Sequence, residues 1–307
     1  MVQKSKKKTN ALLFGSDPEF FATYEKDGQE YAMPPVVFRT ERGVPFEENG
    51  RHPIFARFGD TVVHEDGCAF EMATAPSNDW RSMWNTLKDA RLAFNRDFLS
   101  KYPDLCSGEL KSIPTVGFDT QRWKGSGDEF FMATTFGCDP DEDVYNLRTK
   151  CHVLDASKHG ERYAGGHIHL SGIQEIQESP LIAIRSLVIT AGIASTAFTD
   201  VPDLERKRLF LYGKPGKFRV QNYGKLYKNL PFTNTGIEYR TPSTTWTKDI
   251  SIAEKIFTWA EIGIKSLLCG GLFKNIADSV EMDAVKAILE VDQGTAKDIL
   301  NYIESKV

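Results

Sequence analysis

Four short segments constrain the fold of this chain more than any other feature, because in each of them polar side chains recur at every second residue. The clearest is Ala-Gly-Gly-His-Ile-His-Leu-Ser-Gly at residues 164–172. Successive side chains of a β-strand point to opposite faces, so His167 and His169 share one face. Ile168 and Leu170 share the other face. The segment therefore predicts a strand in a sheet that is covered on one face and polar on the other.

The two histidines of this segment indicate a functional site. Two neutral imidazoles on one face of a strand can reach the same metal ion or the same nucleotide. Gly165 and Gly166, just before the strand, allow a ligand or another backbone to approach closely. A single histidine is more often a hydrogen-bonded structural residue, but two of the six histidines in the chain lie in this pattern. We therefore predict a metal or nucleotide site here.

The first acidic segment, Gly-Ser-Asp-Pro-Glu-Phe-Phe at 15–21, places Asp17 and Glu19 on the same side of an extended chain. Pro18 between them has no N–H to donate to a neighbouring strand, which predicts an edge strand or a bulge. Acidic pairs of this kind are commonly solvated. Taken alone, the segment fits a functional pair and a solvated pair equally well.

The second acidic segment covers residues 64–72 and contains Glu71 between two apolar neighbours. A carboxylate in such a setting costs free energy unless it is paired or binds a metal ion. The alternative is a strand whose second face is exposed to solvent and has no functional role. Asp66 and Glu65 are weaker candidates, because Gly67 can break the strand register.

In the last segment, residues 236–242, Glu238 and Arg240 share a strand face. Such a pair is commonly a structural salt bridge. Beside a metal ion, the carboxylate would instead ligate the metal and the guanidinium would neutralise a phosphoryl group. A basic, glycine-broken stretch precedes this segment, which we interpret either as a polyphosphate-binding loop or as a solvated loop. No Walker-type or GxGxxG motif is present.

These segments, in this order, resemble the glutamine synthetase / glutamate–cysteine ligase superfamily. They are most similar to the phage-type carboxylate–amine ligases, described as COOH·NH2 ligase type 2. The matching runs are Gly-Ser-Asp-Pro-Glu-Phe-Phe at 15–21, Asp-Gly-Cys-Ala-Phe-Glu at 66–71, Gly-Gly-His-Ile-His at 165–169, Tyr-Gly-Lys-Pro-Gly-Lys-Phe-Arg at 212–219 and Glu-Tyr-Arg-Thr-Pro at 238–242. The resemblance extends from residue 15 to about residue 246 and does not cover the chain after about residue 275.

The resemblance implies an α+β fold with a curved, mainly antiparallel, glutamine-synthetase-like sheet and helices on its outer face. It implies an ATP-dependent ligase that joins a carboxylate to an amine through an acyl phosphate, with Mg²⁺ or Mn²⁺ as metal cofactor. The implied metal ligands are Asp17, Glu19, Glu71, His167 and Glu238. The implied catalytic residues are Glu71, Glu238 and Arg240. The implied nucleotide-binding residues are His167, His169, Arg208, Lys214, Arg219 and Arg240.

Two other functions stay open at this point. A metal-dependent hydrolase would use the His-x-His strand to bind Zn²⁺ and would need no ATP. A non-catalytic binding or virion-associated protein could keep the same fold without turnover. For the ligase, the expected partners are small-molecule or peptide carboxylates and amines of unknown identity. Glutamine synthetases form rings, so the resemblance leaves an oligomer open.

Composition limits the partners and the location. The formal net charge is −4, which argues against nucleic acid and against a membrane surface. The five cysteines form no CxxC pair, and no apolar signal segment opens the chain. We therefore expect reduced thiols in the cytoplasm, or in the host cytoplasm if a phage encodes the chain. The apolar stretch 180–198 contains a charge and predicts a buried helix, not a membrane span.

The remaining patterns give a coarse plan. Residues 1–10 read as a flexible basic tail, 11–275 as the catalytic domain with a loop-rich insertion or lid at 99–163, and 276–307 as a helical extension. Residues 77–98 predict a helix, capped by Ser77 or Asn78, with an apolar stripe. The stripe is formed by Trp80, Met83, Trp84, Leu87, Leu92 and Phe94. Further helices are expected at about 179–199, at about 251–268 and, as two short ones, after Met282.

Overall fold

We describe the fold from a computed structural model of the chain. The structure describes residues 11–48, 52–123, 142–147, 159–222, 235–268 and 278–306, together with residues 130, 133, 156 and 276. The predicted basic tail at 1–10 lies outside these residues, as do the cysteines Cys138, Cys151 and Cys269 and parts of the predicted lid at 99–163.

Two sheets form the centre of the molecule. The smaller sheet has the strand order β1 (Leu13–Ser16), β11 (Ile168–Ser171), β13 (Thr235–Tyr239), β12 (Lys217–Asn222) and β9 (Glu142–Asp143). The larger sheet has the order β10 (Glu161–Tyr163), β8 (Thr115–Gly117), β3 (Gln29–Met33), β2 (Glu19–Lys26), β6 (Ala69–Ala73), β5 (Thr61–Asp66) and β4 (Ile54–Phe58), with β7 (Leu110–Lys111) on β2. Only the β3–β8 pair is parallel. In the described part of the chain neither sheet closes into a barrel, and the coarse prediction of an α+β fold with mainly antiparallel strands is confirmed.

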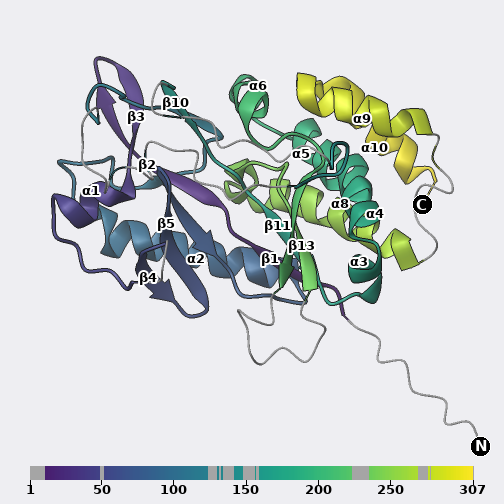
Figure 1. Ribbon diagram of the computed structural model, residues 1–307, viewed down its shortest axis with the longest axis horizontal. Coiled ribbons are helices and arrows are strands. Elements are labelled where there is room, and N and C mark those ends of the chain that lie inside the picture. Colours follow the sequence, from purple (N-terminus) through teal and green to yellow (C-terminus); the bar gives the residue numbers. More distant parts are fainter. Residues whose placement is uncertain are drawn as a thin grey trace, which may run out of the picture.

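The chain passes from one sheet to the other at Asp17 and Pro18, between β1 and β2 (Figure 1). The two sheets are joined there by backbone hydrogen bonds. The amide of Met72 donates to the carbonyl of Pro18 at 3.0 Å, and the amide of Glu19 donates to the carbonyl of Gly165 at 2.9 Å. Proline suits this point because its missing N–H falls between the sheets. Of the two predicted alternatives, the edge strand is found, since β1 is the edge strand of the smaller sheet, and in place of a bulge Pro18 marks a crossing between the sheets.

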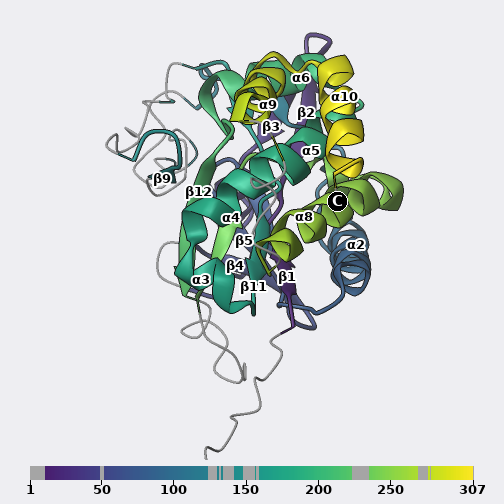
Figure 2. The same ribbon diagram turned by 90° about the vertical axis from the view of Figure 1, so that its right-hand side faces the viewer.

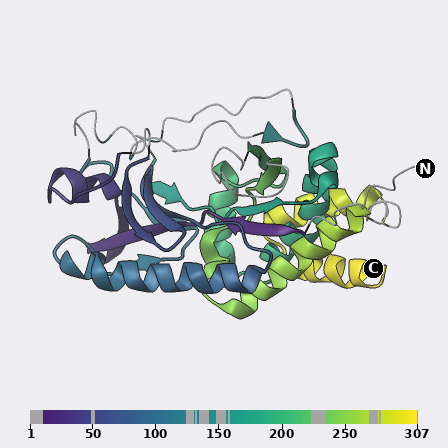
Figure 3. The same ribbon diagram turned by 90° about the horizontal axis from the view of Figure 1, so that it is seen from below.

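Helix α2 (Trp80–Asp97) confirms the predicted helix and packs along β1, β4 and β5 (Figure 3). The predicted cap is wrong. The side chain of Asp79 caps the helix by accepting from the amides of Arg81 and Ser82, both at 3.1 Å. Leu92 is also wrongly placed in the stripe, since it is 53% exposed. The buried stripe consists of Trp80, Met83, Trp84, Leu87, Ala90 and Phe94.

A second group of helices covers the apolar face of the smaller sheet (Figure 2). It contains α3 (Gln174–Glu178), α4 (Pro180–Leu187), α5 (Ile193–Ala197) and α8 (Ile250–Leu268). Between α4 and α5 lies a π-helical turn at Val188–Gly192, where Gly192 lies against the Tyr239 hydroxyl. The stretch Pro180–Ala197 is long and apolar enough to cross a membrane, but 72% of it is buried inside the fold. The prediction of a buried core helix is confirmed.

Several short helices complete the described fold. The predicted C-terminal pair is α9 (Asp278–Glu290), which starts earlier than expected, and α10 (Gln293–Glu304). The others are α1 (Pro35–Thr40), η1 (Leu99–Lys101) and η6 (Thr244–Thr247). A helix that the sequence analysis missed, α6 (Pro202–Leu211), replaces the first part of the predicted basic loop. Pro202 begins it and Asp203 and Glu205 lie in its first turn, which are standard helix-start signals.

Gly166 shows how closely the segments around β11 pack. A Cβ atom at this position would lie 2.2 Å from the carbonyl oxygen of Ser243 and 2.5 Å from Nε1 of Trp246. The Trp246 ring nitrogen donates to the Gly166 carbonyl at 2.9 Å. The predicted close approach of another backbone at this glycine is confirmed. It joins the start of β11 to the segment that follows β13.

We expect Gly166→Ala to lower the free energy of unfolding by about 1–3 kcal/mol, because backbone and an indole ring would have to move. Urea denaturation followed by far-UV circular dichroism measures the change. Gly160→Ala is the matched control, since a Cβ at Gly160 meets no atom within 4 Å. Equal stability of the two variants would contradict the packing described above.

Candidate metal centre

The register of the smaller sheet brings four positions into one row. Gly15 of β1 pairs with His169 of β11, His169 pairs with Glu238 of β13, and Glu238 pairs with Arg219 of β12. Side chains directly opposite each other on antiparallel strands point to the same face. The alternate positions, such as Ile168 and its partner on β13, are fully buried against the helices. The row therefore forms part of the polar face of the sheet, opposite the face that the helices cover.

The larger sheet contributes a second row. Glu19 of β2 pairs with Glu71 of β6, and Glu71 pairs with His64 of β5. Asp66 follows His64 by two residues and so points to the same face. Glu65 points the other way and pairs with Arg39 at 2.9 Å. Of the two acids that the sequence analysis ranked as weaker candidates, Asp66 belongs to the site and Glu65 does not.

The crossing between the sheets brings the two rows together as two acidic groups. Asp17, His169 and Glu238 form one group, and Glu19, Asp66 and Glu71 form the other. Within each group the potential ligand atoms lie within 4.8 Å of one another.

His167 lies between the two groups and is 1% exposed. Its Nδ1 atom is 3.2 Å from Oδ1 of Asp17 and 3.4 Å from Oε1 of Glu238. Its Nε2 atom is 3.9 Å from Oε1 of Glu19. The sequence analysis assigned metal binding to His167 and left nucleotide contact open for both histidines. The structure places both imidazoles beside Asp17, with His169 Nε2 at 3.0 Å.

Glu238 is fully buried and has three polar neighbours. It forms an ion pair with Arg240 and accepts a hydrogen bond from Nε2 of Gln221 at 2.5 Å. Arg219 is the third neighbour, with its Nη1 atom 3.8 Å from Oε2 of Glu238. Burial raises the pKa of the Glu238 carboxyl, but the charges of Arg240, His167 and His169 together outweigh it and the net pKa is lowered. Glu238 is therefore a carboxylate at neutral pH.

The electrostatics of the remaining acids differ. Burial raises the pKa of Asp17, but the neighbouring His169 and His167 bring it well below its usual value. Burial, and then the charge of Glu19, raise the pKa of Asp66 to about 6. Mutual repulsion of crowded carboxylates is relieved by a proton or by a bound cation.

His64 belongs to the edge of the same group. Burial, and then the neighbouring His52, lower the pKa of His64 to about 4, so its ring is neutral at pH 7. Its Nε2 atom lies 2.8 Å from Oε1 of Glu71 and can donate a hydrogen bond to it. A neutral histidine that orients a carboxylate is a common neighbour of a metal ligand.

The donor chemistry fits divalent metal ions. One group offers only carboxylate oxygens, the donors that Mg²⁺ prefers, and the other adds an imidazole nitrogen, which Mn²⁺ also accepts. Oδ1 of Asp66 is buried and has no hydrogen-bond partner among the described residues. A buried carboxylate oxygen without a partner costs free energy unless a cation occupies the space beside it.

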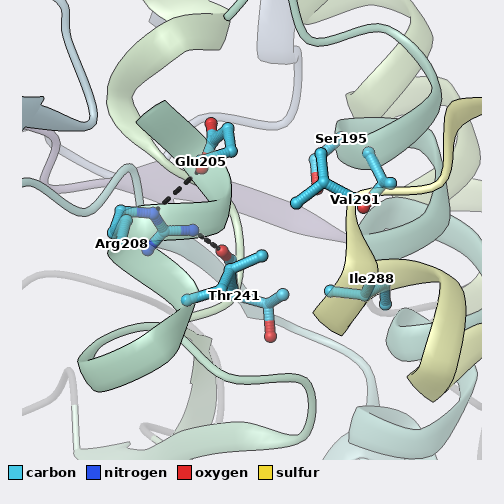
Figure 4. A pocket seen from close by; sticks show the side chains of 8 residues that line it. Ser195, Glu205, Arg208, Thr241, Ile288 and Val291 are labelled. Atoms are coloured by element: carbon cyan, nitrogen blue, oxygen red, sulfur yellow. Dashed lines mark hydrogen bonds and ion pairs between the residues drawn. The ribbon is translucent and has the colours of Figure 1, made fainter. Parts of the chain in front are cut away.

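Two of the predicted nucleotide-binding cations lie elsewhere. Arg208 is on helix α6, is 1% exposed, and pairs with Glu205 at 3.0 Å while donating to the carbonyl of Thr241 (Figure 4). The cavity beside it, about 10 Å³, has room for roughly one water molecule. Lys214 is exposed in the turn between α6 and β12. The geometry thus gives no support to nucleotide contact by Arg208, because a helix buries its charge where a loop was expected.

Three members of the site were not singled out from the sequence, His64, Tyr212 and Gln221, and Asp66 was named only as a weaker candidate. For Asp66 the usable signal was its two-residue spacing from His64. Tyr212 lies inside the run 212–219 that carries the family resemblance, but nothing in its local pattern points to the site. Comparison with known proteins finds no family model that matches this sequence and no curated protein that matches it.

We expect the protein to bind two Mn²⁺ ions per chain, one at each acidic group. Glu71→Gln should reduce the number to one, because an amide is a far weaker metal ligand than a carboxylate while still accepting the hydrogen bond from His64. Electron paramagnetic resonance of free Mn²⁺ during titration measures both values.

Glu254→Gln is the control for this titration, since Glu254 is 53% exposed on α8 and pairs only with Arg81 among the described residues. It should bind two ions like the unmodified protein. Two ions bound by Glu71→Gln with unchanged affinity would remove Glu71 from the metal centre.

Proposed function

We propose that this chain is an ATP-dependent carboxylate–amine ligase with a glutamine-synthetase-like sheet, which forms an amide or peptide bond through an acyl phosphate. One observation carries the proposal. Two candidate metal groups lie next to each other where the two sheets meet, with Arg240 and Arg219 beside them. Paired divalent ions beside guanidinium groups are the usual apparatus of phosphoryl transfer.

The charge balance of the site supports this proposal. Its carboxylates outnumber its guanidinium groups: the carboxylates are Asp17, Glu19, Asp66, Glu71 and Glu238, and the guanidinium groups are those of Arg219 and Arg240. Divalent ions would reverse this excess of negative charge and so prepare the face for a polyphosphate. Held by the two acidic groups, Mg²⁺ or Mn²⁺ would supply positive charge that neutralises the charge developing on the phosphate oxygens of ATP.

The resemblance and the geometry support each other. The matching runs are distant in the sequence, yet Asp17, His169, Glu238 and Arg219 from four of those runs lie together on the same polar face. Antiparallel strands with helices on the opposite face agree with the expected architecture at the coarse level. A polyphosphate on this face would lie above the strands and away from the helical layer.

In the proposed reaction, an oxygen of the substrate carboxylate attacks the γ-phosphorus of ATP. The bond from that phosphorus to the bridging oxygen breaks, and ADP leaves. Arg240, oriented by Glu238, and Arg219 stabilise the charge on the transferred phosphoryl group. The nitrogen of the amine then attacks the acyl carbon, phosphate leaves, and a carboxylate of the site accepts the proton of the amine.

A rival function makes a different prediction at the same site. Asp17, His169 and Glu238 form a ligand set that Zn²⁺ also accepts, so a metal-dependent hydrolase could be built on it. Such an enzyme would turn over without ATP. A non-catalytic or virion-associated protein would bind the metal and show no turnover.

We expect ADP and phosphate to form when the protein is incubated with ATP, Mg²⁺ or Mn²⁺, and pooled carboxylates and amines. Glu238→Gln should lower the rate at least about a hundredfold, because it removes both a metal ligand and the charge that orients Arg240. Coupled detection of ADP measures the rate, with Glu254→Gln as the surface control.

The outcomes separate the candidate functions. ADP formation that depends on one pool of substrates and is lost in Glu238→Gln would support the ligase. Metal-dependent ester or amide hydrolysis without ATP would favour the hydrolase. Metal binding with neither activity in any pool would contradict the ligase and favour a binding protein.

A further inference from the structure

The hydroxyl of Tyr212 is the point at which the two metal groups and the arginine meet. It lies 3.0 Å from Nε2 of His167, 2.8 Å from Oε1 of Glu19 and 3.1 Å from Nη2 of Arg240. Tyr212 follows helix α6 directly, so it reaches the site from outside both sheets. Three functional side chains therefore share one phenolic oxygen.

Counting protons at this oxygen determines the direction of each hydrogen bond. A phenol has one hydrogen to donate and two lone pairs that accept. Arg240 can only donate, and the Oε1 atom of Glu19 accepts. The Tyr212 hydrogen must then go to Glu19, and the second lone pair must accept from His167. The Nε2 atom of His167 therefore carries a hydrogen.

This arrangement leaves the other ring nitrogen for Asp17 and Glu238. When a divalent ion takes the place of a hydrogen on Nδ1, the lone pair of that atom faces Asp17 at 3.2 Å and Glu238 at 3.4 Å. Three electron-rich atoms facing one another repel unless a cation lies between them. Neighbouring ligands of an octahedral Mg²⁺ are about 3.0 Å apart, given metal–oxygen distances of about 2.1 Å. The observed separations are close to this value.

We propose that Tyr212 is a positioning residue that holds His167 in the Nε2–H tautomer, so that Nδ1 joins Asp17 and Glu238 as a ligand of a divalent ion. The inference rests on the proposed function only for the presence of a metal at this group. The same hydroxyl also orients Glu19 of the second metal group. The other carboxylate oxygen of Glu19 accepts a hydrogen bond from the Gly165 amide at 2.6 Å. One side chain thus couples the geometry of both ions.

The test uses Tyr212→Phe, which keeps the ring and removes only the hydroxyl. We expect its Mn²⁺ affinity to fall by about tenfold to a hundredfold, the usual effect of losing a residue that orients a metal ligand. NMR of histidine-labelled, Zn²⁺-loaded protein reports which ring nitrogen carries the hydrogen. In the unmodified protein the His167 signal should show hydrogen on Nε2, and in the variant this preference should be lost.

Tyr145→Phe is the matched control, because the Tyr145 hydroxyl donates to Glu281 at 2.8 Å, away from the metal groups. It should keep the unmodified metal affinity and the His167 signal. Unfolding by urea shows whether either variant is merely destabilised. A loss of stability alone would lower the folded fraction without changing the tautomer of His167 in the folded molecules.

The results distinguish this inference from the ligase proposal. Unchanged Mn²⁺ affinity and an unchanged His167 signal in Tyr212→Phe would overturn the positioning role and leave the ligase standing. Absence of ATP turnover in the unmodified protein, with the Tyr212→Phe effects intact, would overturn the ligase and support the positioning role. An unmodified protein that binds no divalent metal would overturn both.

Discussion

The ion pair between Glu238 and Arg240 is the interaction on which the polar face of this protein depends. Glu238 is fully buried at the centre of the smaller sheet, where an uncompensated carboxylate would be strongly destabilising. Arg240 supplies the compensating charge and is itself held by the Tyr212 hydroxyl. His169 and Arg219 flank Glu238 on the adjacent strands. The Glu238–Arg240 ion pair therefore also sets the electrostatic potential at these two side chains. The other acids of the site lie around this ion pair.

The crossing at Asp17 and Pro18 has the next largest consequence. It lets consecutive residues of one segment serve two different sheets, so that Asp17 joins the smaller sheet's group and Glu19 the larger sheet's group. Hydrogen bonds from Gly165 and to its carbonyl hold Glu19 against the start of β11. Gly165 is needed here, since a Cβ at this position would lie 2.1 Å from the ring of His167. The two candidate metal groups therefore lie next to each other.

Much of the fold and of the site was predictable, and the errors have physical reasons. Two-residue periodicity correctly separates His167 and His169 from the buried residues between them, because a strand alternates its faces whatever its neighbours are. The same reasoning could not decide between Glu65 and Asp66, since Arg39, the partner that makes Glu65 structural, lies far away in the sequence. Arg208 was taken for a loop cation because a short helix rich in charged residues, without a distinct apolar face, resembles a basic loop. Its true partner, the carbonyl of Thr241, is determined only by packing.

The sequence by itself determined the class of the fold, the alternation of polar and apolar faces, and the residue types available for metal and phosphate chemistry. These follow from local rules of strand geometry and side-chain chemistry. Only the tertiary structure decided the register that places His169 beside Glu238, the division of the acids into two groups, and the position of Tyr212 between them. Those relations join residues as much as 193 positions apart, such as Tyr212 and Glu19. A local pattern cannot specify them, because they depend on how the sheets and helices pack together.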